Sequence, residues 1–209
     1  MLKVLLIDDH ALIRKGLMKI LLEEFPSADI DEASSAEDVT KLVIRKDYDI
    51  IISDLNMPGR NGLEVVEYLK RYFPKTPVLV LSMQPEEQYA IRALKTGAAG
   101  FLSKDTATDE LIKAVQMVLQ GRRYVSSSLS ENLLESLNNV SDKPLHELLS
   151  NREFHVFRLL AEGKSVSMIA KQLTLSVTTI STFRSRIIGK MNLKTNADFT
   201  KYCIRENLM

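Results

Sequence analysis

The sequence is poor in cysteine, because Cys203 is the only one among its 209 residues. The chain can therefore form no internal disulfide, and a zinc site built from several cysteines is excluded. Long apolar runs are also missing, since no segment approaches the roughly 18 consecutive apolar residues of a membrane-spanning helix. The N-terminus lacks the charged, apolar and small-residue regions of a signal peptide. These absences predict a cytoplasmic protein with no membrane partner.

Net charge is also small, at +1, but its distribution is uneven. Residues 1–121 carry 15 Lys and Arg against 19 Asp and Glu, a net −4, and residues 122–147 carry 3 against 4. Residues 148–209 carry 10 against 4, a net +6. A basic C-terminal part is typical of a segment that meets a polyanion. A solvated basic face explains the charge equally well when the charge is considered alone.

The first 121 residues alternate apolar runs with amphipathic stretches, which is the pattern of βα units on a parallel sheet. Helical periodicity between the runs completes five such units and predicts one α/β domain, residues 1–121. The five runs predict strands near Lys3–Ile7, Ala28–Ala33, Ile50–Ser53, Val78–Leu81 and Gly100–Leu102.

A polar segment follows at residues 122–147, and its amphipathic piece Leu129–Leu137 predicts a linker with a short helix. From residue 148 the pattern is helical only. A capping-box signature at Ser150 and Glu153 marks the first helix start. We expect a small all-α domain at 148–209, with Cys203 packed in its last helix. Its four predicted helices cover about 151–162, 166–173, 177–191 and 196–206.

Carboxylates stand where two predicted strands end. Asp8 and Asp9 follow the first strand, and Asp54 closes the third. Ligand sites of open α/β sheets lie outside the carboxyl ends of the strands, so the three side chains can share one pocket. Crowded carboxylates raise each other's pKa or recruit a cation, and oxygen ligands suit a hard divalent metal. The pattern therefore points to a metal-assisted chemistry at this edge.

Two later strands add a hydroxyl and an ammonium group, from Ser82 and Lys104. An Asp beside a metal can attack phosphorus, and such neighbours can hold the phosphoryl oxygens. Each residue also has a simpler explanation when it is taken singly. Acidic pairs are more often solvated turns or helix caps, Ser82 can cap a strand end, Lys104 can be a surface charge, and Phe101 can be core. His10 receives no role.

The motifs that contain these residues occur in the order and at the intervals of a known protein family. Asp8-Asp9, the run Asp54–Gly59, Gly62, Leu81-Ser82 and the run Gly97–Lys104 resemble the receiver domain of a two-component response regulator. The resemblance implies a flavodoxin-like, five-stranded parallel (βα)5 sheet. It implies Asp54 as phosphoacceptor, Ser82 and Lys104 as phosphoryl-sensing groups, and Phe101 as an aromatic that swings inward when Ser82 moves. It also implies Mg²⁺, held by Asp8, Asp9, Asp54 and the backbone carbonyl of Asn56.

The predicted helix 177–191 has two different faces. Ile180, Phe183, Ile187 and Met191 form an apolar stripe, and small polar residues occupy the other face. An ordinary surface helix has the same pattern, but a helix of this kind also suits insertion into a major groove.

Residues 148–209 are similar to the helix-turn-helix domain of the NarL/LuxR class, through Leu149–Glu153, Leu160–Ser165, Ser176–Ile180 and Lys190–Leu193. The resemblance implies base reading by Ser181, Thr182 and Ser185. It implies phosphate contacts by Thr179, Arg184, Arg186, Lys171 and Lys190. Because Ser and Thr pair with several bases, the operator sequence does not follow.

Together these features predict a phosphorylation-activated transcriptional regulator and not an enzyme, beyond its own phosphorylation and dephosphorylation at Asp54. The expected partners are double-stranded promoter DNA, a sensor histidine kinase and a second copy of the chain, with RNA polymerase as a further candidate. Two alternatives remain. An aspartyl-phosphate hydrolase usually has a second Asp two residues after its nucleophile, where this chain has Asn56. A phosphorylation-independent binding protein would use the acidic pocket only to shape an interface.

Overall fold

The computed structural model describes residues 1–55, 62–84, 86–127, 129–130 and 144–208. The chain divides into two compact units, Met1–Asn139 and Val140–Met209. The domain limits expected at residues 121 and 148 stay a prediction, and most of the short helix expected at Leu129–Leu137 lies outside the described residues. None of the helices in the described part of the chain has the length and apolar character needed to cross a bilayer.

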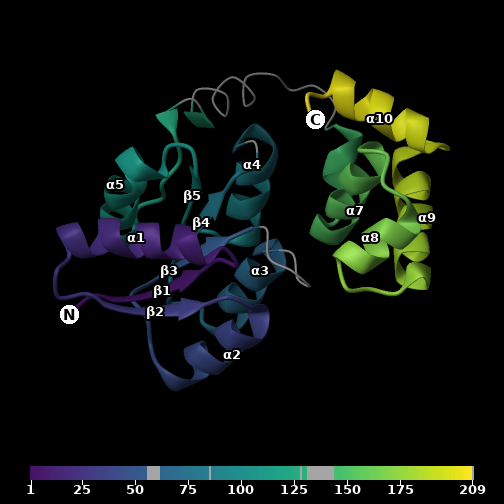
Figure 1. Cartoon of the computed structure of the whole chain (residues 1–209). Helices are drawn as coiled ribbons and strands as arrows, with labels where there is room; N and C mark the ends of the chain where they lie inside the picture. The colour runs from purple at the N-terminus through teal and green to yellow at the C-terminus, as the bar shows by residue number, and fades with distance from the viewer. Residues whose placement is uncertain (56–61, 85, 128, 131–143, 209) are drawn as a thin grey trace. The chain divides into compact units, whose positions relative to one another are not determined.

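The first unit is a parallel sheet in the order β2-β1-β3-β4-β5, which confirms the predicted α/β fold. Helices α1 and α5 cover one face, and α2, α3 and α4 cover the other (Figure 1). The strands are β1 (Lys3–Ile7), β2 (Asp29–Ala33), β3 (Ile50–Asp54), β4 (Val78–Ser82) and β5 (Gly100–Ser103). The helices are α1 (Ala11–Glu24), α2 (Ala36–Arg45), α3 (Gly62–Tyr72), α4 (Glu86–Thr96) and α5 (Ala107–Leu119).

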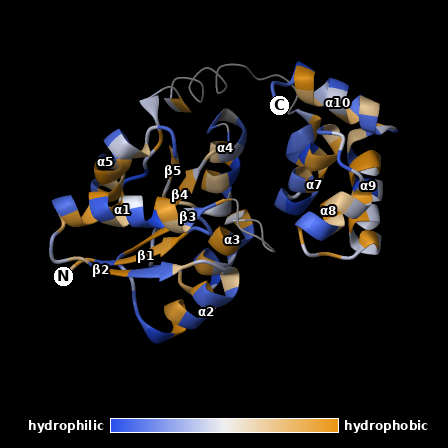
Figure 2. Cartoon of the chain, in the orientation of Figure 1, coloured by the Kyte–Doolittle hydropathy of each residue, from blue (hydrophilic) through white to orange (hydrophobic). Residues whose placement is uncertain are grey.

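Burial explains why the sequence forms these strands. All five residues of β3 and of β4 are buried, as expected for central parallel strands whose two faces are both covered by helices. Figure 2 shows β1, β3 and β4 as the hydrophobic centre of the unit. The edge strand β2 differs, because Asp29, Asp31 and Glu32 keep it partly exposed. Charged residues on an edge strand discourage pairing with another chain.

The opposite edge of the sheet is closed by residues that the sequence assigned to the linker. Tyr124 pairs with Gly100 of β5. Its amide donates to Ala99 O at 3.0 Å, and its carbonyl accepts the amide of Phe101 at 3.0 Å. Its side chain is buried. The start of the expected linker therefore packs as part of the first unit.

The second unit is all-helical, and its four predicted helices are found within one residue at each end. Ser150, Ser165, Ser176 and Thr195 cap them, each side chain accepting a backbone N–H at the helix start. The helices are α7 (Asn151–Ala161), α8 (Val166–Gln172), α9 (Val177–Met191) and α10 (Asn196–Arg205), preceded by η1 (Leu145–Leu148), a short 3-10 helix that no sequence pattern predicted.

The core of the second unit contains most of the expected apolar stripe of α9. Three of its residues are buried, namely Ile180, Ile187 and Met191. Phe183 is only half-buried, so the helical period overstated its burial. Cys203 is a fully buried packing residue, and burial raises the pKa of its thiol to about 12.

Candidate functional site

Three carboxylates meet at the carboxyl edge of the sheet. Strands β1 and β3 are neighbours with Ile7 opposite Ser53, so Asp8, Asp9 and Asp54 leave the sheet side by side. One ligand atom from each carboxylate and one ring nitrogen of His10 all lie within 4.8 Å of one another. Asp8 and Asp54 are each 2% exposed, whereas Asp9 and His10 are exposed to solvent. The structure thus brings together the three acidic residues that the sequence analysis selected.

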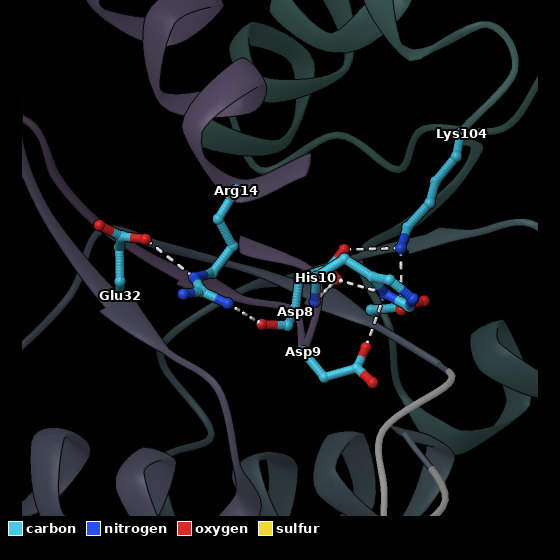
Figure 3. A network of polar contacts seen from close by, with 7 residues as sticks. Asp8, Asp9, His10, Arg14, Glu32 and Lys104 are labelled. Atoms are coloured by element: carbon cyan, nitrogen blue, oxygen red, sulfur yellow. Dashed lines mark hydrogen bonds and ion pairs between the residues drawn. The ribbon is translucent and has the colours of Figure 1, made fainter. Parts of the chain in front are cut away.

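Lys104 enters the same pocket from the end of β5. Its Nζ lies 2.6 Å from Asp8 Oδ2, a contact drawn in Figure 3. It also lies 2.8 Å from Asp54 Oδ2. Its side chain is 6% exposed, so Lys104 is not a surface charge. Burial by itself lowers the pKa of this ammonium group, but the hydrogen bonds to Asp54 and Asp8 outweigh it and hold the pKa above its usual value. A positive group therefore stays between the two buried carboxylates.

Ser82 ends β4 and is fully buried. Its hydroxyl accepts the amide of Gln84 at 3.0 Å, and its carbonyl accepts the amide of Lys104 at 2.9 Å. The backbone at Lys104 is therefore joined directly to the end of β4. Phe101, on β5 opposite Val80, is also fully buried, and its ring is enclosed in the core.

Two further motif positions, Asn56 and Gly62, follow Asp54 in the sequence. Asn56, the expected carbonyl ligand, lies outside the described residues. Gly62 begins α3, and its amide donates to Leu55 O at 2.9 Å. A Cβ on Gly62 would stand 2.5 Å from Asp54 O, so only glycine lets α3 begin this close to the phosphoacceptor candidate.

The pocket also contains three residues to which the sequence analysis gave no role. His10 Nδ1 lies 2.8 Å from Asp9 Oδ1 and 3.2 Å from Asp8 Oδ1. Arg14 of α1 donates to the carbonyl of Asp8 and to the carboxylate of Glu32 on β2 (Figure 3). The signal for His10 in the sequence was its position directly after the acidic pair. The signal for Arg14 was its position one helical turn after His10. No local pattern connects Glu32 with them.

Helix α9 carries the candidate base readers of the second unit. Ser181, Thr182 and Ser185 are all exposed on it. The hydroxyl of Thr182 donates to the carbonyl of Thr178 at 3.0 Å, one turn earlier in the same helix. These three positions therefore present small, uncharged side chains, and Ser176 caps the start of the helix.

The candidate phosphate-contact residues fall into two groups. Lys171 and Arg186 are exposed, and Thr179 is half-buried with its hydroxyl 2.7 Å from that of Ser176. Two others are engaged within the unit. Lys190 Nζ lies 2.6 Å from Glu153 Oε2, and Arg184 Nε donates to Asn196 Oδ1 at 3.3 Å.

Glu153 explains why Lys190 is held. This carboxylate is 3% exposed and also accepts the amide of Ser150 at 2.8 Å. Burial by itself raises the pKa of Glu153, but the hydrogen bonds from Lys190 and Ser150 outweigh it and lower the pKa below its usual value. Lys190 is thus a partner of a buried carboxylate as well as a candidate phosphate contact.

Comparison with known proteins finds relatives for both units. Residues 4–116 match the family described as "Response regulator receiver domain", and residues 147–203 match "Bacterial regulatory proteins, luxR family". The chain is 31% identical over 209 residues to "Response regulator UvrY" of Escherichia coli (strain K12), with 100% of this chain and 96% of that protein covered. It is also 31% identical over 215 residues to "Oxygen regulatory protein NreC" of Staphylococcus carnosus (strain TM300), covering 100% and 99%.

Among solved structures, the chain is similar to RcsB from Salmonella enterica serovar Typhimurium bound to promoter rprA in the presence of phosphomimetic BeF3-. The TM-score is 0.69 at 28% identity, and the match covers 96% of this chain and 97% of that one. Another RcsB match is described as a complex with DNA, with a TM-score of 0.60 at 28% identity and 96% of each chain covered.

Proposed function

The chain belongs to the response regulators that join a receiver domain to a LuxR-family DNA-binding domain, and we propose that its chemistry takes place at Asp54. Asp54 accepts a phosphoryl group with the help of Mg²⁺, and the phosphorylated chain dimerises and binds promoter DNA. The observation that carries the proposal is the buried pair of Asp54 and Lys104, at 2.8 Å, beside two further carboxylates.

The donor set fits Mg²⁺. Asp8, Asp9 and Asp54 supply oxygen atoms, which this hard cation prefers, and these atoms lie close enough to one another to share one ion. Three carboxylates and one Lys104 ammonium leave a formal charge of −2, which a divalent cation balances. When bound, Mg²⁺ neutralises charge that otherwise repels a phosphoryl donor.

Phosphoryl transfer then uses the chain's own groups. A carboxylate oxygen of Asp54 forms a bond to phosphorus while the bond from phosphorus to the donor's leaving group breaks, and the leaving group takes up a proton. Lys104 already lies 2.8 Å from Asp54 and donates to the phosphoryl oxygens as negative charge builds up there. The Ser82 hydroxyl, at the next strand end, is a second donor. A sensor histidine kinase or a small phosphodonor supplies the phosphoryl group.

Phosphorylation changes the charge on Asp54 to about −2 and adds oxygen acceptors. Because Ser82 O accepts the amide of Lys104, movement of either residue shifts the ends of β4 and β5 together. A small shift there alters the surface available for pairing with a second copy. Two DNA-binding units in one dimer then engage two half-sites, which raises affinity over that of one unit. RNA polymerase is a further partner under this proposal.

The test compares the wild type with Asp54→Ala, using acetyl phosphate, Mg²⁺ and a DNA site selected in vitro. We expect an acid-labile phosphoryl adduct and tighter DNA binding as a dimer in the wild type alone. If the wild type forms no adduct, the phosphoacceptor role fails. An adduct without change in oligomeric state or DNA affinity would refute the coupling. Continuous release of phosphate far beyond one equivalent would favour the hydrolase alternative.

A further inference from the structure

Arg14 joins two strands at the edge of the acidic pocket. From α1, its Nη1 donates to the backbone carbonyl of Asp8 at 2.6 Å, and its Nε donates to Glu32 Oε2 at 2.8 Å. The side chain is 14% exposed, which is low for an arginine on a helix surface. Figure 3 shows the guanidinium group between Glu32 and Asp8. A planar group with two donors in use is held in one orientation.

The carbonyl that Arg14 holds belongs to the peptide unit between Asp8 and Asp9. Because that unit is planar, the direction of its C=O sets the torsions on both sides of it. Those torsions aim the two neighbouring carboxylates. The other polar atoms of Asp8 have partners too: its amide donates to Ala33 O at 3.2 Å, its Oδ1 accepts the amide of His10 at 2.8 Å, and its Oδ2 accepts Lys104 Nζ at 2.6 Å.

Arg14 carries a positive charge close to a site that must attract a cation, and Glu32 offsets that charge. Two effects of Arg14 on cation binding therefore have opposite signs. As a charge, Arg14 weakens the attraction of the pocket for a divalent ion. As a clamp on the Asp8–Asp9 peptide, it strengthens binding because the carboxylates need no reorganisation.

We infer that Arg14 is a positioning residue of the cation site, anchored by Glu32, and that its clamp on the Asp8 carbonyl outweighs its charge. The inference rests on the proposed function, since it concerns the cation site beside Asp54. It gives β2 a role at the pocket through Glu32, although this strand delivers no carboxylate to the cation. Residues that contact a metal ligand in this way orient the ligand without binding the metal themselves.

The test measures Mn²⁺ binding to the full chain by electron paramagnetic resonance, with Mg²⁺ affinity obtained by competition. The variants are Arg14→Gln, Arg14→Lys, Glu32→Gln and the double variant Arg14→Gln/Glu32→Gln. Lys15→Gln removes a positive charge from an exposed neighbour on the same helix and serves as the matched control. Thermal unfolding of each variant establishes that it is folded at the assay temperature.

Positioning predicts that Arg14→Gln and Arg14→Lys each weaken Mn²⁺ binding, by roughly 10-fold, as is typical when an outer partner of a metal ligand is lost. Glu32→Gln weakens binding, and the double variant binds no better than Arg14→Gln. Lys15→Gln stays within a factor of about two of the wild type.

A charge effect alone predicts a different pattern, with tighter binding in Arg14→Gln and wild-type binding in Arg14→Lys and the double variant. That pattern would overturn the inference, and so would unchanged binding in all four variants. If Arg14→Gln does not fold, Arg14→Lys still separates the two accounts, because it keeps the positive charge and only the positioning role predicts weaker binding. Failure of the wild type itself to bind Mn²⁺ or Mg²⁺ would refute the proposed function rather than the role of Arg14 alone.

Discussion

Thr182 shows how one hydrogen bond inside a helix limits what a side chain can recognise. Its hydroxyl proton is donated to Thr178 O, yet the residue is exposed on α9. A donor that is already used is not free to read the acceptor atoms of guanine or adenine. The methyl group is unaffected, and it suits apolar contact with the methyl group of thymine.

We therefore predict that Thr182→Val keeps most of the affinity for a selected DNA site, whereas Thr182→Ser loses about 1 kcal/mol, or roughly 5-fold. Val keeps the shape and loses the hydroxyl, and Ser does the reverse. Fluorescence anisotropy on the full chain gives the two affinities. Replacing the contacted thymine with uracil should weaken the wild type and leave Thr182→Ser unchanged. Loss of binding in Thr182→Val with wild-type binding in Thr182→Ser would show that the hydroxyl is the reader.

At the scale of elements, the edge of β5 depends on a close approach between Gly100 and Tyr124. A Cβ on Gly100 would lie 2.8 Å from Tyr124 O and 2.9 Å from Tyr124 Cβ. Ser126, two residues later, donates its hydroxyl to Glu86 Oε2 of α4 at 2.6 Å. The segment after α5 is thus held by both β5 and α4. Strand β5 contains the switch candidate Phe101, and α4 follows the strand that ends at the other candidate, Ser82.

We predict that Gly100→Ala lowers the free energy of unfolding of the first unit by about 1–3 kcal/mol, as expected for overpacking. Gly16→Ala is the matched control, because a Cβ on this α1 residue meets no described atom within 4 Å apart from its chain neighbours and the nearby backbone of its own helix. The control should stabilise the unit by about 0.5–1 kcal/mol. Urea unfolding followed through the amide NMR signals of β5 measures both changes. A Gly100→Ala variant as stable as the wild type would show that Tyr124 moves away freely.

At the scale of the whole molecule, the net charge of +1 conceals a basic second unit. Association with DNA releases counterions in proportion to the phosphates that the protein neutralises. The local excess of +6 in residues 148–209, and not the total charge, should therefore govern the salt dependence of binding.

We expect the logarithm of the DNA affinity to fall linearly with the logarithm of salt concentration, and Arg186→Gln to reduce the slope by about 1 for each bound copy of the chain. Arg186 is exposed on α9. Lys75→Gln, an exposed lysine of the first unit, should leave the slope unchanged. Affinities measured between about 50 and 200 mM salt test both expectations. Equal slopes for Arg186→Gln and the wild type would remove Arg186 from the phosphate contacts.

Much of the fold and of the pocket could be predicted from local sequence. Continuous apolar runs define buried strands, and carboxylates at the ends of β1 and β3 must meet because neighbouring parallel strands end together. Caps such as Ser150 and Thr195 mark helix starts, because their side chains accept hydrogen bonds from backbone amides only three residues further along the chain. These features depend on short sequence separations or on a fixed period. Phe183 is the exception, since helical period alone overstated its burial.

The two element patterns, the polar groups at strand ends and the division of charge all follow from the amino-acid sequence alone. The contacts between distant residues arise only when the chain packs: Arg14 with Glu32, Lys190 with Glu153, and Tyr124 with the edge of β5. They could not be predicted because a single Arg, Lys or Tyr has no periodic signature that identifies its partner. The group that it meets depends on how strands and helices pack after the local pattern has been satisfied.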